Sequence, residues 1–117
     1  MEAQRTELLK VLPEYGWRVA VLEQNLEWWA DEMWQLQSVW SPIHSHAYLT
    51  FLVDPMSGDD RKKGDGVWAV MASPAKPDSW THVEGGFTLT LGRRWKDRLP
   101  DLLDHLSKLR TANGHSG

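Results

Sequence analysis

The sequence contains no cysteine. Disulfide bridges, thiolate metal sites and thiol nucleophiles are therefore excluded, and an intracellular protein is the simplest interpretation. The sequence also has no run close to the roughly 18 consecutive apolar residues that a membrane-spanning helix needs. Its N-terminal segment, MEAQRTELLK, is charged and lacks the apolar core of a signal peptide. We therefore expect a soluble, cytoplasmic protein with no membrane contact.

A basic excess is lacking as well, because the formal net charge is −3. Nucleic-acid-binding domains usually carry an excess of Lys and Arg, so we expect no nucleic-acid partner. One local basic cluster beside Trp95 is the remaining candidate for contact with a single strand. The cluster consists of Arg93, Arg94, Lys96 and Arg98. It is kept as a minor alternative.

Motifs that carry catalysis or bind metals are also missing. Ser45 lies between His44 and His46, but no Gly-rich strand-to-helix turn accompanies it, as a nucleophile elbow would require. The two histidines have no third ligand at a diagnostic spacing. We therefore predict no catalytic residue, no metal ligand and no cofactor.

Acidic and aromatic side chains gathered near residue 30 support an alternative function. The group consists of Glu27, Trp28, Trp29, Asp31 and Glu32. Such combinations occur where sugars are bound, but a glycosidase needs two carboxyl groups facing each other across a cleft, roughly 5 to 10 Å apart. A helical turn would instead place Glu27 and Asp31 side by side. The alternative is a small metal-dependent or sugar-acting enzyme that uses residues 27–46.

The clearest strand pattern is residues 47–53, AYLTFLV, which contain no Gly, Pro or charge and end at Asp54-Pro55. Both alternating faces of this run are apolar, which is typical of a strand covered on both sides. Residues 67–73 have the same character. Residues 17–22 and 87–91 are also predicted to be strands, and the clean alternation of the latter indicates one solvated face.

Residues 22–40 fit two periods. Leu22, Leu26, Trp29 and Met33 recur at helical spacing, whereas the segment after Met33 alternates as a strand does. We predict a helical turn or short helix over residues 26–32 and a strand over 33–40. A helix throughout would leave the sheet with four strands.

Helices are predicted at both ends of the chain. Residues 2–12 place apolar side chains on one side and end at Pro13, where Gly16 supplies the positive φ of the following turn. The last helix carries Trp95 and a stripe of leucines, with Asp97 as its N-cap and Pro100 in its first turn.

The predicted fold is a single α+β domain over residues 1–114, followed by a frayed tail at 115–117. It has an antiparallel sheet of four to five strands with the N- and C-terminal helices packed on one face, in the order α-β-β-β-β-β-α.

Tryptophan supplies the functional prediction. The sequence has eight tryptophans, and each ring can bury on the order of 200 Å². Two helices cover one face of such a sheet, and no element is left for the other. We therefore predict a small protein-interaction or adaptor module that binds a second copy of itself, or another protein, through Trp34, Trp40 and Trp68. A strongly curled sheet that encloses these rings itself is the alternative.

Overall fold

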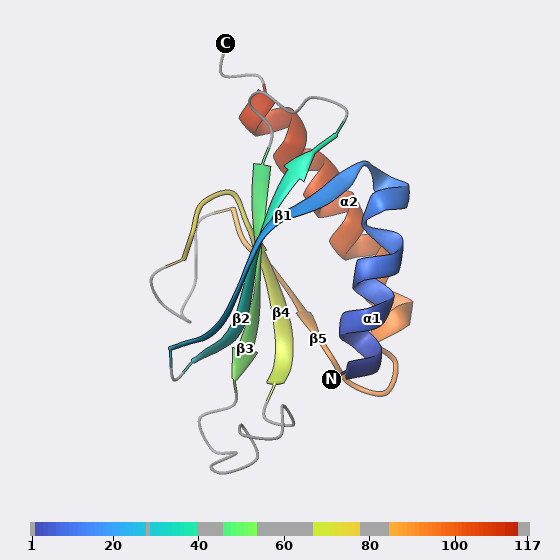
Figure 1. The fold of residues 1–117 in the computed structure, drawn as a ribbon. Helices are drawn as coiled ribbons and strands as arrows, with labels where there is room; N and C mark the ends of the chain where they lie inside the picture. Colours follow the sequence, from blue (N-terminus) through green and yellow to red (C-terminus); the bar gives the residue numbers. More distant parts are fainter. Residues whose placement is uncertain (1, 28, 40–45, 54–66, 78–84, 115–117) are drawn as a thin grey trace.

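One antiparallel sheet with a helix at each end of the chain makes up the computed structural model, which describes residues 2–27, 29–39, 46–53, 67–77 and 85–114 (Figure 1). The elements are α1 (Glu2–Val11), the 3-10 helix η1 (Pro13–Tyr15), β1 (Trp17–Glu27), β2 (Ala30–Ser38), β3 (His46–Val53), β4 (Val67–Ser73), β5 (Phe87–Thr90) and α2 (Trp95–Gly114). The five strands follow the order β1-β2-β3-β4-β5, so each strand pairs with its neighbours in the chain. Both helices lie on the same side of the sheet (Figure 1). The predicted α+β fold is confirmed.

The strands predicted at residues 47–53 and 67–73 are confirmed and correspond to β3 and β4. The predicted helical turn at residues 26–32 is wrong, because β1 continues to Glu27 and β2 begins at Ala30. Leu22 and Met33, which share a helical period in the sequence, lie on opposite faces of the sheet, since Leu22 pairs with Trp34. The favourable helix propensity of Glu, Gln and Met is overridden by strand pairing.

β1 contains one irregularity that matters below. The pairing register with β2 shifts between Val19 and Val21, which leaves Ala20 as an extra residue. Such a bulge reverses the alternation of side chains along the strand. Before the bulge Val19 faces the helices opposite Leu36, and after it Leu22 faces the helices opposite Trp34.

The predicted turn after α1 is confirmed. Gly16 has φ 81°, and its N–H donates to the carbonyl of Pro13 at 3.1 Å. The predicted start of α2 is wrong, because the helix begins at Trp95 and Asp97 is therefore not its N-cap. The N–H of Asp97 donates to the Arg94 carbonyl at 3.1 Å, a tight first turn that starts the helix earlier. Pro100 consequently lies within the helix, with an exposed side chain.

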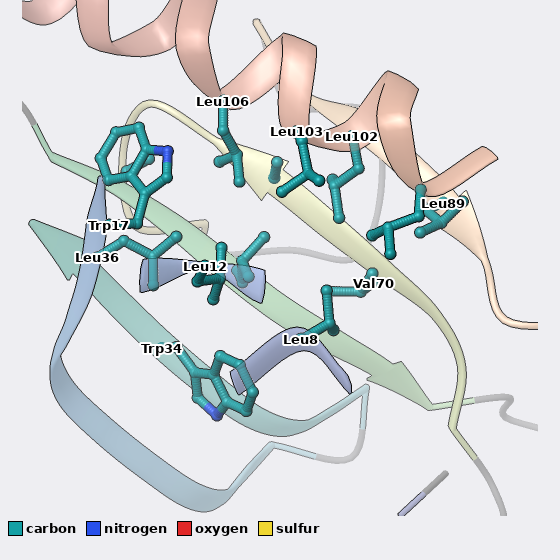
Figure 2. Packing of buried hydrophobic residues seen from close by; sticks show 14 of the residues in the cluster. Leu8, Leu12, Trp17, Trp34, Leu36, Val70, Leu89, Leu102, Leu103 and Leu106 are labelled. Atoms are coloured by element: carbon teal, nitrogen blue, oxygen red, sulfur yellow. The ribbon is translucent and has the colours of Figure 1, made fainter. Parts of the chain in front are cut away.

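The main core lies between the helices and the sheet (Figure 2). Figure 2 shows the α2 leucines pointing toward β-strand residues such as Val70 and Leu89. α1 contributes Leu8, and Leu12 follows directly after α1; both side chains are fully buried. Each buried leucine stabilises the fold by about 1.5–3 kcal/mol. Both terminal helices are therefore needed to enclose this face.

The opposite face is also partly enclosed, which corrects the expectation that nothing covers it. A second buried cluster lies there and consists of Trp29, Ala30, Leu52, Ala69 and Met71. The segment after β4 crosses this face, because Lys76 Nζ lies 3.5 Å from a carboxylate oxygen of Glu23 on β1, with β2 and β3 in between. In Figure 1 this segment leaves β4 on the side away from the helices. Residues 74–77, after β4, thus serve as a partial cover.

Candidate protein-interaction surface

The three tryptophans predicted as anchors have different positions. Trp34 is fully buried on the helix-covered face, with its ring centroid 4.8 Å from that of Phe51 and 5.9 Å from the Arg5 guanidinium carbon. It is closed to a partner because it shares a face of β2 with Leu36, and α1 covers that face. Trp40 lies outside the described residues. Trp68 is 41% exposed and sits at a register irregularity of β4.

The other described tryptophans are enclosed by the chain itself. Trp17, Trp29 and Trp95 are all buried. Within the described residues, Trp68 is thus the one indole with a large exposed area. Most of the apolar side chains that could contact a partner are therefore not tryptophans.

Exposed apolar side chains of the described residues gather around one edge of the sheet. Those more than a third exposed are Leu9, Tyr15, Val21, Leu22, Val39 and Trp68. All except Trp68 belong to α1, η1, β1 or the residue after β2. Val39 is held beside the start of β1, because its N–H donates to the Gly16 carbonyl at 2.9 Å. We call Leu9, Tyr15, Val21, Leu22 and Val39 the β1-edge surface, which spans both faces of β1 because Val21 pairs with Gln35 and Leu22 pairs with Trp34.

A pocket of about 400 Å³ adjoins this surface and shares Leu9 and Val39 with it, where α1 and η1 meet the start of β1. Its lining comprises Leu9, Leu12, Pro13, Trp17, Arg18, Val19 and Val39. Arg18 is the one charged member of this lining. The remaining side chains offer a partner apolar contacts, which is typical of the centre of a protein interface.

The β1 backbone adds hydrogen-bonding capacity beside the pocket. β1 is an outermost strand of eleven residues, and its one strand partner in the described part of the chain is β2. Natural edge strands are usually protected by shortness, Lys, Pro or a bulge. The opposite edge strand, β5, has four residues. β1 has neither Lys nor Pro and relies on the Ala20 bulge, so it is the edge better suited to adding a strand.

The residues considered for chemistry do not form a site in the described structure. The Glu32 carboxylate is 2% exposed and accepts hydrogen bonds from Arg5 Nε at 3.1 and 3.0 Å and from Gln24 Nε2 at 2.8 Å. It is therefore closed to a substrate. His46 is exposed at the start of β3, its ring edge-on to Tyr48 at 6.3 Å. His44 lies outside the described residues.

The described ranges hold no group of three His, Cys, Asp or Glu residues that is arranged to bind a metal ion. The side chain of Glu27 is not among those described, and Asp31 is half-buried. In the basic cluster, Arg94 pairs with Asp97 and Arg98 pairs with Asp101, at 3.0 and 3.1 Å. These acidic neighbours reduce the positive field that a phosphate would meet.

Comparison with known proteins leaves the surface as the main functional evidence. No family model, curated protein or solved structure matches this chain. Among the described helices, none is long and apolar enough to cross a membrane. The β1-edge surface is not predictable from the sequence pattern, because local periodicity does not reveal the order of the strands in the sheet. The signal that was present is the apolar character of Val19, Val21 and Leu22 on both faces of one strand.

Proposed function

We propose that the protein is a small protein-interaction module that forms a homodimer through the β1-edge surface. The observation that carries the proposal is the concentration of exposed apolar side chains there. All but one of the large apolar side chains that remain exposed in the described residues lie on this surface. Exposed apolar side chains gathered along one edge of a folded domain are typical of interaction sites.

The proposal keeps the predicted function and relocates the interface. Trp34 is excluded as an anchor because it is buried, whereas Trp68 stays a candidate contact for another protein. We also propose a cytoplasmic location, which the absence of cysteine supports. The enzyme alternative has no support of its own, since Glu32 is engaged by Arg5 and Gln24.

Sedimentation velocity over a range of micromolar concentrations tests the proposal. We expect the wild type to dimerise and Leu22→Lys to be monomeric, because a charge would replace a 39% exposed apolar side chain at the β1 edge. Trp68→Lys is the matched control, since Trp68 is 41% exposed but lies elsewhere. It should dimerise as the wild type does. Circular dichroism checks that both variants are folded.

Two outcomes contradict the proposal. A wild type that is monomeric at every concentration removes the homodimer. Dissociation by Trp68→Lys but not by Leu22→Lys would place the interface at Trp68 instead.

A further inference from the structure

We propose that two copies join β1 to β1 as antiparallel neighbours, with Arg18 of one copy opposite Glu23 of the other. This inference rests on the proposed function and specifies its partner, strand direction and register. The result would be one continuous sheet of two subunits, with the two-fold axis between Ala20 and Val21.

The local sequence is self-complementary under this operation. Residues 18–23 read Arg-Val-Ala-Val-Leu-Glu, with a cation at one end, an anion at the other and four apolar residues between them. Antiparallel pairing about the centre places Arg18 opposite Glu23 of the second copy, and Val19 opposite Leu22 of the second copy. The pairs form twice because the interface is isologous. An unrelated strand would lack this match of charge and apolarity.

The bulge makes the register possible. Residues directly opposite in an antiparallel pair must lie on the same face of the sheet. Arg18 and Glu23 are an odd number of positions apart, so a regular strand would put them on opposite faces. Their β2 partners are Gln37 and Met33, which are an even number apart and share a face. The extra residue Ala20 therefore brings the two charged side chains onto one face.

The apolar pair obeys the same rule. Val19 pairs with Leu36 and Leu22 pairs with Trp34, and both of these β2 residues face the helices. Val19 and Leu22 of opposing copies would therefore meet on the helix side of the joined sheet. Val19 also lines the pocket, so this contact lies beside it.

The charged side chains are available for this exchange. Arg18 is exposed and donates a hydrogen bond to the side-chain oxygen of Gln37. Glu23 is 40% exposed and its partner Lys76 is 58% exposed, at 3.5 Å. Solvent-exposed contacts of this kind are weak, so they yield readily to a cross-strand partner in a second copy.

Charge reversal tests the register. Arg18→Glu and Glu23→Arg each place two pairs of like charges across the axis, and each should weaken the dimer about tenfold. An equimolar mixture of the two single variants should form a heterodimer, because every opposing pair is then of opposite sign. The double variant R18E/E23R should dimerise as the wild type does.

Cross-linking gives a second readout, since the chain has no other cysteine. Val19→Cys mixed with Leu22→Cys should form an intermolecular disulfide on mild oxidation, because directly opposed residues lie within disulfide reach. Either variant alone should cross-link much less.

The outcomes separate the register from the function. A monomeric wild type refutes the proposed function and the register together. A wild-type dimer that is lost in Leu22→Lys but indifferent to both charge reversals refutes the register and leaves the function standing. Equal cross-linking by the single cysteine variants would also overturn the register.

Discussion

The ion pair between Arg5 and Glu32 tests how α1 is held on the sheet. Glu32 is 2% exposed and Arg5 is 23% exposed, and Arg5 Nε contacts both carboxylate oxygens. Replacing Arg5 with Met keeps most of the apolar stem and removes the charge. The carboxylate then keeps Gln24 Nε2 as a donor but loses its cation.

Removing one partner of a buried ion pair costs about 3–5 kcal/mol, because a buried charge is left uncompensated. Arg5 is partly reached by water, so we expect Arg5→Met to lower the free energy of unfolding by about 3 kcal/mol. Domains of this kind have total stabilities of about 5–15 kcal/mol. Urea denaturation monitored by circular dichroism therefore resolves the change easily.

A double-mutant cycle and an exposed control complete the test. The variant R5M/E32M should recover much of the loss, because it leaves no buried unpaired charge and the exposed Gln24 amide can donate to water instead. Arg94→Met breaks the exposed pair with Asp97 and should cost under about 1 kcal/mol. A loss below about 1 kcal/mol in Arg5→Met, with an unchanged dependence on urea, would show that Glu32 is hydrated and would refute the described packing of α1.

Two further stability predictions use matched pairs of variants and the same urea assay. Gly16→Ala should lower the free energy of unfolding by about 1–2 kcal/mol, because Gly16 has φ 81°. Gly92→Ala is its control, since an added Cβ there meets no atom within 4 Å, and equal losses would contradict the reasoning. Leu106→Ala should cost about 2–5 kcal/mol, because Leu106 is fully buried. Leu9→Ala, at 37% exposure, should cost under about 1 kcal/mol, and a larger loss there would place Leu9 in the core.

The sequence predicts much of the fold where the pattern is local and strong. β3 and β4 follow from uninterrupted apolar runs, and the turn at Gly16 follows from Pro13 and the need for a positive φ. The hairpin between β1 and β2 was missed because Leu22, Leu26 and Met33 imitate a helical period. The conformation of both segments is decided by their pairing with each other, and a sequence window that covers one strand does not show this pairing.

The candidate surface was harder to predict than the fold. Alternation placed Trp34 on the same face as Leu36, but it did not reveal that α1 covers this face. The edge position of β1 and its bulge at Ala20 arise from strand order and register. Neither property can be read from the residue type at a single position. The exposure of Val21 and Leu22 therefore follows only from the three-dimensional structure.

The order of the sheet has a consequence for how the chain folds during synthesis. Each strand pairs with its neighbours in the chain, so hairpins can form one after another as the polypeptide leaves the ribosome. α2, however, follows every strand and supplies buried leucines such as Leu102 and Leu106. A nascent chain that has completed its sheet but not yet released α2 therefore leaves exposed to water the apolar side chains that these leucines later cover.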